Sequence, residues 1–209
     1  MLFSKIELSE AERNLIYFSN LYSTKEKSLD SLLNKFTLEK DAKFQYIGEY
    51  VPKSMVKERY SISSYLKVHV LENGKVFLSC IYCGLDDCLY KSVKVSCDGL
   101  FVESSPYKPN QTHNYAYTDD VYYWRTLILK EKESREIINF IDSYASYKIN
   151  VSLIGDYNYS YILDEKYKLA VKDACFLASL IEETKELKRN ISSTKNQIYN
   201  AKQKIERQQ

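Results

Sequence analysis

The segment from Leu177 to Ile205 reads LASLIEETKELKRNISSTKNQIYNAKQKI, and it decides how the C-terminal part of this chain folds. Apolar and small residues follow one another in it at alternating spacings of three and four: Leu177, Leu180, Thr184, Leu187, Ile191, Thr194, Ile198, Ala201 and Ile205. A helix with this heptad pattern buries a narrow stripe against another helix. Since no Gly or Pro occurs from Asp164 to Gln209, the sequence predicts one long helix over 164–209 with a coiled-coil seam.

Such a helix would be about 69 Å long at 1.5 Å per residue, which exceeds the width of a compact domain of this size. We therefore expect part of the seam to contact another chain. The residues predicted to form that coiled-coil interface are Leu180, Leu187, Ile191, Ile198 and Ile205. The Thr and Ala positions of the seam bury little area, so it is expected to need the globular domain or a larger partner to hold it.

The charges beside the seam indicate which pairing of helices is favoured. Lys188, Lys195 and Lys202 share heptad position e. An antiparallel self-pair would bring these lysines together, whereas a parallel self-pair sets Glu183 opposite Lys188. The sequence therefore favours a parallel self-pair, or an acidic helix of another protein, as the partner.

Composition limits the class of protein. The 209 residues are 44% hydrophobic and 28% charged, which suits one well-cored domain and a helical extension. The 30 basic and 28 acidic residues nearly cancel, so no global field attracts the molecule to nucleic acid or to an anionic membrane. No apolar stretch approaches the roughly 20 residues that span a bilayer, and the start lacks a signal-peptide pattern. The sequence predicts a cytoplasmic protein without a membrane span.

Residues 1–163 are predicted to form a globular α+β domain that opens with a helical region over 1–37. Ser9 and Glu12 have the capping-box spacing and precede an amphipathic pattern, so a helix is expected to begin there. A second helical pattern starts at Leu29. No Gly or Pro separates the two patterns, so the helices are either continuous or kinked near Ser23.

The middle of the chain alternates between apolar and polar residues, as strands do. Residues 65–71 and 76–83 flank Asn73-Gly74, the signature of a two-residue type I′ hairpin turn. A loop over 84–87, a strand over 88–95 and a turn at Asp98-Gly99 before 100–103 complete a predicted β-meander of about four strands. Residues 104–120 are expected to form a long loop and 121–130 a strand.

A helix over 133–147 and a hairpin over 149–163 around Gly155 follow before the long C-terminal helix. The predicted fold is therefore α+β, with a mainly antiparallel sheet, made of a β-meander plus a hairpin, covered by helices.

The candidate binding residues lie in the long loop and the strand after it. Tyrosines and amides alternate there, as they do on surfaces that recognise proteins or stack on bases and sugars. The residues predicted to contact a partner are Tyr107, His113, Tyr115, Tyr117 and Arg125. The alternative is that aromatics from Tyr122 to Trp124 fill the core and that the 20 tyrosines reflect an AT-rich genome rather than function.

The sequence gives no reason to expect a metal or another cofactor. Four of the five cysteines, Cys80, Cys83, Cys88 and Cys97, lie close enough in sequence to consider zinc, but their spacing does not match paired knuckles. Buried thiols of the sheet are the simpler interpretation. A disulfide between Cys83 and Cys88 is conceivable only in an exported protein.

Catalytic signatures are also missing from the sequence. There are two histidines: His69 is expected on the solvated side of a strand, while His113, near Asp119 and Asp120, could be a base, a ligand or part of a solvated polar cluster. No Gly-rich phosphate loop and no nucleophile motif occurs. An enzyme is not excluded, since carboxylate chemistry leaves no local signature.

Three functions follow from these observations, and the first is favoured. The leading hypothesis is a non-enzymatic interaction or assembly protein that recognises a macromolecular partner through its Tyr-rich surface and associates through the coiled coil. The first alternative is a nucleic-acid-associated protein that uses the basic C-terminal helix, and the second is an enzyme with a carboxylate or His113 site. The composition is consistent with a bacterial, phage or mobile-element origin, including a defence-related binder.

Overall fold

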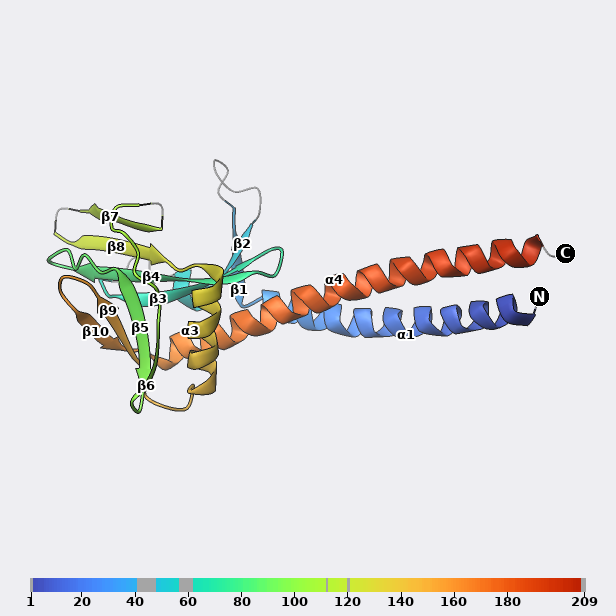
Figure 1. Ribbon diagram of the computed structural model, residues 1–209, viewed down its shortest axis with the longest axis horizontal. Helices are drawn as coiled ribbons and strands as arrows, with labels where there is room; N and C mark the ends of the chain where they lie inside the picture. The colour runs from blue at the N-terminus through green and yellow to red at the C-terminus, as the bar shows by residue number, and fades with distance from the viewer. Residues whose placement is uncertain (1, 41–47, 57–61, 112, 120, 208–209) are drawn as a thin grey trace. The chain divides into compact units, whose positions relative to one another are not determined.

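The computed structural model describes residues 2–40, 48–56, 62–111, 113–119 and 121–207, with side chains from Lys5 onward. These residues form two compact units. We call Asn34–Ala178 the sheet unit, and Met1–Leu33 together with Ser179–Gln209 the helical pair. The last helix of the chain belongs to both units, because it begins in the first and ends in the second (Figure 1).

The sheet unit contains two antiparallel sheets. One has the strand order β1-β2-β3-β4-β8-β7 and the other β10-β9-β5-β6. The strands are β1 (Phe36–Glu39), β2 (Glu49–Pro52), β3 (Tyr65–Leu71), β4 (Val76–Gly84), β5 (Ser92–Cys97), β6 (Leu100–Glu103), β7 (Asn114–Thr118), β8 (Tyr123–Ile128), β9 (Asn150–Ile154) and β10 (Tyr159–Ile162). The helices of this unit are the short α2 (Lys53–Val56), α3 (Glu131–Ser143) and the start of α4 (Glu165–Glu206). The predicted α+β class, with antiparallel sheets and a long C-terminal helix, is confirmed.

The core of the sheet unit lies between the two sheets and α3. Alternate residues of both sheets supply its apolar side chains, as expected for strands with one face turned to a core. Those with no exposed surface include Leu78, Cys80, Leu127, Val93, Val95, Val151, Leu153, Ile137 and Ile141. Tyr90 lies two residues before β5, and its hydroxyl donates to the backbone oxygen of Cys80 in β4 at 2.5 Å, which links the two sheets.

Two turns show how glycine sets the strand pairing. Asp98 and Gly99 both have positive φ, which a two-residue type I′ turn requires, so the predicted turn between β5 and β6 is present. At the β3–β4 hairpin only Gly74 has positive φ, and the amide of Gly74 donates to Leu71 O at 2.8 Å. This is the three-residue loop with a bulge, so the type I′ prediction for Asn73-Gly74 was wrong although the hairpin itself is present.

The predicted meander is interrupted after β4. The chain does not return beside β4 through the loop at 84–87. β8 occupies that edge of β4, and β5 pairs instead with β6 and β9 in the other sheet. The predicted strand order was wrong here. Each edge of a strand can pair with one neighbour, and that edge of β4 pairs with β8, which is distant in sequence, rather than with β5. The hairpin of β9 and β10 around Gly155 is present as predicted.

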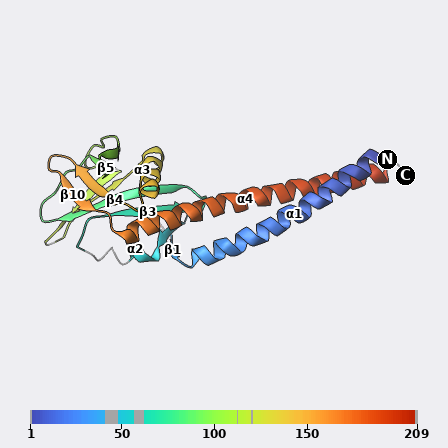
Figure 2. The ribbon, with the colours of Figure 1, turned by 90° about the horizontal axis from the view of Figure 1, so that it is seen from below.

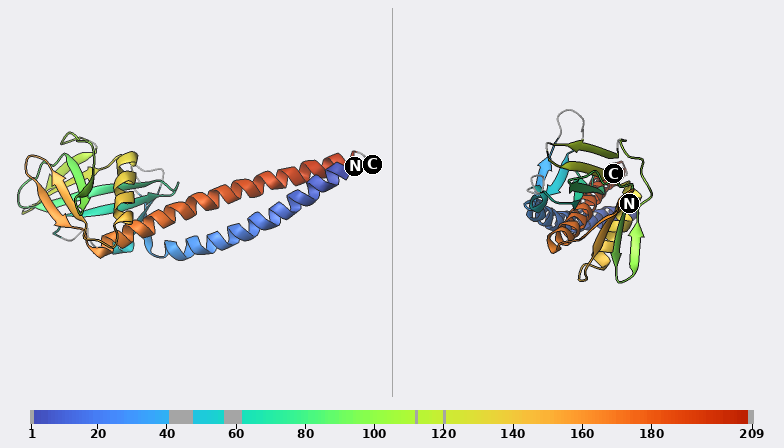
Figure 3. Two further views of the ribbon diagram at one scale, coloured as in Figure 1. Left: turned by 60° about the horizontal axis from the view of Figure 1, so that its bottom comes forward. Right: turned by 90° about the vertical axis from the view of Figure 1, so that its left-hand side faces the viewer.

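The helical pair consists of α1 (Leu2–Leu33) and the part of α4 from Ser179 onward. The two helices run antiparallel, since Lys25 Nζ lies 2.6 Å from Glu183 Oε2 and Lys204 Nζ lies 3.8 Å from Glu7 Oε2. The start of α1 and the end of α4 therefore lie together at one end of the pair (Figures 2 and 3). The predicted start at Ser9 was wrong: the helix is continuous through that residue and through Ser23.

The helix α1 has a heptad repeat of its own, which packs against the seam of α4. Its positions follow at spacings of three and four: Leu8, Ala11, Leu15, Phe18, Tyr22, Lys25, Leu29 and Leu32. The α4 seam thus contacts a helix of its own chain in the antiparallel sense. The division of the chain into domains 1–163 and 164–209 stays a prediction, because it would be tested by whether each fragment folds by itself.

Candidate binding edge on β7

Arg125, one of the five predicted partner-binding residues, lies inside the sheet unit. It is 1% exposed, its Nε and Nη2 donate to the carboxylate of Asp87 at 2.9 and 2.7 Å, and its Nη1 donates to Asn114 Oδ1 at 3.1 Å. The hydrogen bonds from Arg125 hold the pKa of Asp87 below its usual value. The guanidinium of Arg125 thus has its hydrogen-bond acceptors within the sheet unit, on Asp87 and Asn114. Arg125 holds the 84–87 segment against β8, and its buried side chain is not available to a partner.

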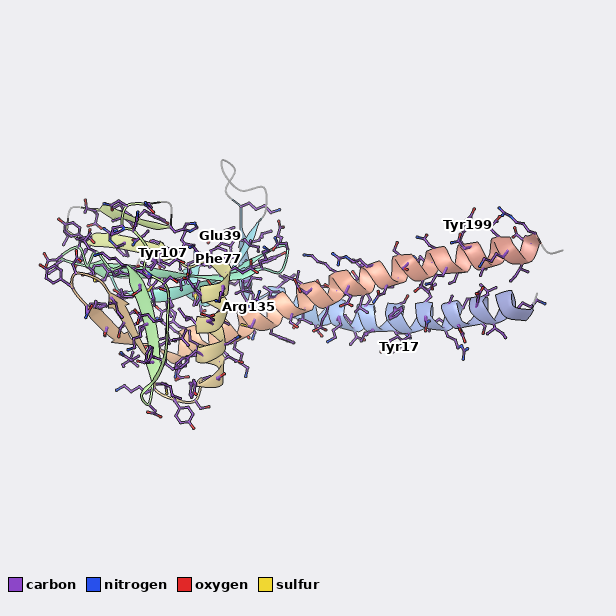
Figure 4. All side chains as sticks on the ribbon, in the orientation of Figure 1. Tyr17, Glu39, Phe77, Tyr107, Arg135 and Tyr199 are labelled. Atoms are coloured by element: carbon purple, nitrogen blue, oxygen red, sulfur yellow. The ribbon has the colours of Figure 1, made fainter. Side chains whose placement is uncertain are left out.

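Tyr107 is also held within the sheet unit, where it is half-buried (labelled in Figure 4). Its hydroxyl donates to the carboxylate of Glu133 and accepts from the backbone amide of Lys130 at 2.8 Å. Burial raises the pKa of Tyr107 above its ordinary value, and the hydrogen bond to Glu133 raises it further. Tyr107 therefore fastens the segment before β7 to the first turn of α3.

The other three predicted residues are exposed and lie together in sequence. His113 immediately precedes β7, and Tyr115 and Tyr117 are 45% and 57% exposed within it. The expected loop over 104–120 thus contains a strand at 114–118, for which the spacing of two between the tyrosines was the signal in the sequence. Two residues on one face of a strand are separated by one residue, so both rings lie on the same side of the sheet.

Tyr117 is stacked on Trp124 of the neighbouring strand. Their ring centroids are 6.0 Å apart and their planes differ by 4°. Trp124 is 9% exposed, and its Nε1 donates to Asp119 Oδ2 at 3.0 Å. The other oxygen of Asp119 accepts from the amides of Tyr122 and Val121, and these hydrogen bonds lower the pKa of the carboxyl group. Sequence reasoning missed Trp124 and Asp119 as the residues that hold Tyr117 in place.

We call Tyr115, Tyr117 and Trp124 on β7 and β8 the aromatic edge, because β7 is the last strand of its sheet (Figure 1). The five residues of β7 read NYAYT and include no charged side chain. Natural edge strands are usually protected from other strands by lysine, proline or a bulge. An uncharged edge with exposed rings can add a strand of another protein, or pack its rings against one.

The predicted coiled-coil residues line the contact between α4 and α1. Leu180 and Leu187 are 1% and 7% exposed, whereas Ile191, Ile198 and Ile205 are half-buried. Near the free end of the pair a cavity of about 380 Å³ lies between the helices, beside Ala11 and Ala201. The seam residues Thr194 and Ala201 and the facing Ala11 are nevertheless buried. A contact of the predicted residues with a further chain stays a prediction.

His69 is buried, so the prediction that it lies on a solvated surface was wrong. Its Nε2 lies 2.6 Å from Ser79 Oγ, its Nδ1 is hydrogen-bonded to Glu49, and its ring is stacked on Phe77 with 4.4 Å between centroids. The order Ser, His, carboxylate is the order of a nucleophilic triad. A nucleophile must reach its substrate, however, and Ser79 is 3% exposed. The group is best described as a buried hydrogen-bond relay across β2, β3 and β4.

Metal ligation and thiol chemistry were the other possibilities that the sequence raised. Across those residues no group of three or more His, Cys, Asp or Glu side chains is placed to hold a metal ion. The five cysteines are free thiols, and four of them are buried. Burial raises the pKa of Cys80 to about 12, which makes it a poor nucleophile. Asp120, named with His113 as a possible site, lies outside the described residues.

A search of the described helices finds none that is both long and apolar enough to cross a membrane. Comparison of the chain with protein-family models, with curated proteins and with solved structures found no match.

Proposed function

We propose that this chain is a non-catalytic interaction protein that binds another protein through the aromatic edge of β7. The observation that supports this most is the exposed pair Tyr115 and Tyr117 on an uncharged edge strand, with Tyr117 fixed against Trp124. Tyrosine supplies a large contact area at a low cost in conformational entropy. A ring that is already held by stacking loses still less freedom on binding.

A protein partner suits this surface better than a nucleic acid. The strand β7 contains no lysine or arginine, and phosphate contacts from such residues supply most nonspecific affinity for nucleic acid. Basic residues of α4 are partly occupied by α1: Lys204 lies 3.8 Å from Glu7, and Lys188 lies over the ring of Tyr22 at 5.3 Å. Two of the basic residues that the alternative would use therefore already contact α1.

The proposal is tested by photo-crosslinking in the organism that makes the protein. A photoreactive phenylalanine analogue replaces Tyr115 in one strain and Tyr199 in another. Tyr199 is a matched control, because it is a tyrosine that is 65% exposed on α4, in the helical pair (labelled in Figure 4). We expect a discrete crosslinked protein band from position 115 and none from position 199. Equal or absent crosslinking at the two positions would show that the aromatic edge is not a binding surface.

A further inference from the structure

We infer that the protein bound at the aromatic edge is a second copy of this chain, whose β7 pairs antiparallel with β7 of the first and places Tyr117 on the two-fold axis. This inference rests on the proposed function and names the partner at the same site. It follows from the backbone hydrogen bonds of β7, from its neighbours in the fold and from the side chains that would meet.

The backbone of β7 has a short stretch of outward-facing hydrogen-bonding groups. The amide of Ile128 donates to His113 O at 2.7 Å, and Tyr115 and Tyr117 lie opposite Thr126 and Trp124 in the same register. Hydrogen-bonded pairs alternate with non-bonded pairs in an antiparallel ladder. The odd-numbered residues of β7 therefore bond to β8, and the amide and carbonyl groups of the even-numbered residues point away from the sheet.

One of those even-numbered residues is already occupied. The amide and carbonyl of Asn114 exchange hydrogen bonds with Gln111 at 2.9 and 3.0 Å, and the two residues form an isolated bridge. No hydrogen bond between described residues engages the outward groups of Ala116 and Thr118. The stretch that can accept another strand is thus three residues long, from Ala116 to Thr118.

This length selects the register of the second strand. With Tyr117 on the axis, Ala116 of each copy lies opposite Thr118 of the other, and their outward groups form four hydrogen bonds. With Ala116 on the axis, Thr118 of one copy would lie opposite Asn114 of the other, where Gln111 already bonds. Only the first register uses every outward group of the open stretch.

The side chains suit the same register. Residues on the axis form a non-hydrogen-bonded pair, in which the Cα atoms approach to about 4.5 Å and the side chains lie side by side. Tyr117 of one copy would face Tyr117 of the other, each backed by its own Trp124. The observed two-ring stack would become a ladder of four rings, the kind of cross-strand aromatic contact that stabilises antiparallel sheets.

Charge also favours an identical copy. A two-fold axis brings each residue near its own duplicate, so a charged edge would repel itself, whereas β7 carries no charge. The flanking carboxylate of Asp119 lies two residues beyond Tyr117. In the proposed register it would lie opposite Tyr115 of the second copy rather than opposite its own duplicate. The edge is therefore self-complementary in hydrogen bonds and brings no like charges together at the axis.

The test uses charge at the axis. The full chain is prepared as wild type, as Tyr117→Glu and as Tyr117→Lys, and its mass in solution is measured by light scattering over a range of concentrations. We expect a dimer for the wild type, loss of the dimer for each single variant because like charges meet at the axis, and return of the dimer when the two variants are mixed. Tryptophan fluorescence checks that each variant is folded, since Trp124 is the one tryptophan of the chain.

A cysteine placed at the axis gives an independent readout. In Tyr117→Cys the two introduced thiols meet across the axis, where the Cα separation suits a disulfide, whereas the thiol of Tyr115→Cys faces Asp119 of the second copy and should not crosslink. The wild type supplies the background from the native thiols. A wild type that stays monomeric, a dimer that survives Tyr117→Glu, or equal crosslinking at 115 and 117 would overturn the inference. If the wild type is monomeric and position 115 still crosslinks a different protein, the proposed function stands without it.

Discussion

The sheet unit and the helical pair are stabilised in different ways. The sheet unit has apolar side chains with no exposed surface on both sheets and on α3, while several seam residues of the helical pair, such as Ile191 and Ile198, remain half-buried. Two helices can cover only one stripe of each other, whereas two sheets and a helix enclose a core. The helical pair has the most regular sequence pattern of this protein, yet the sheet unit has the most completely buried side chains.

The largest effect is expected for Arg125→Ala in the sheet unit. The substitution leaves the carboxylate of Asp87 and the side-chain oxygen of Asn114 without their donor. Breaking a buried pair typically costs about 3–5 kcal/mol, and we expect the lower end of that range because the side chain of Asp87 is 25% exposed. The measurement is urea unfolding followed by the fluorescence of Trp124, which reports on the sheet unit. Asp87→Asn is a matched variant that removes the charge from the other side. If Arg125→Ala unfolds at the wild-type urea concentration, Arg125 is a surface residue as the sequence suggested.

The second prediction compares equivalent truncations in the two units. Leu153→Ala, at a site without exposed surface, should cost about 3 kcal/mol, and Ile198→Ala, at a half-buried site, about 1 kcal/mol. Far-UV circular dichroism, which is dominated by the long helices, would be recorded beside tryptophan fluorescence in each denaturation. An equal cost at both sites would mean that the helical pair is covered in solution by something further.

The third prediction concerns pH and the relay at His69. Burial lowers the pKa of His69 despite its hydrogen bond to Glu49; the charge of Lys67 also lowers it, and the charge of Glu39 opposes this. Below the unfolded value of about 6.5 the unfolded chain therefore binds more protons than the folded one. Stability should therefore fall as the pH drops from 7 toward 5.

The variant His69→Gln is the control between pH 7 and 5. Glutamine does not titrate, so the stability of this variant should depend less on pH in that range. The carboxyl of Asp87, whose pKa is also lowered, loses its contribution only as the pH falls below about 4, so the two effects separate. A wild type whose stability is constant between pH 7 and 5 would show that His69 keeps an ordinary pKa.

The smallest effect is expected on the surface of the helical pair. Lys25→Ala removes the ion pair between Lys25 and Glu183, whose side chains are 33% and 41% exposed, respectively. Exposed pairs of this kind contribute about 0–1 kcal/mol, and salt screens them. The thermal midpoint should change by no more than a few degrees. A large loss would reveal that Lys25, at a seam position of α1, packs against α4 through its aliphatic stem.

Much of the fold followed from local patterns. The spacing of Leu180, Leu187 and Ile191 predicted the long helix, and the pairs around Gly74, Gly99 and Gly155 predicted hairpins that are present. The candidate site was predicted less well. Tyr115 and Tyr117 are exposed as expected of binding residues, but Arg125 and Tyr107 hold the interior together, and Trp124 was not assigned a role in the site.

The sequence by itself determined most of the helices and strands, because a helix or strand that buries one face must repeat its apolar residues every 3.6 or every two positions. The strand β7, which buries only Asn114 of its five residues, was not predicted. Only the tertiary structure decided which segments that are distant in sequence lie together. β8 rather than β5 occupies the edge of β4, α1 covers the seam of α4, and Arg125 is buried because Asp87, 38 residues away, reaches it. Pairing depends on competition among distant segments for the same edge or stripe, and a local period carries no information about which of them will lie there.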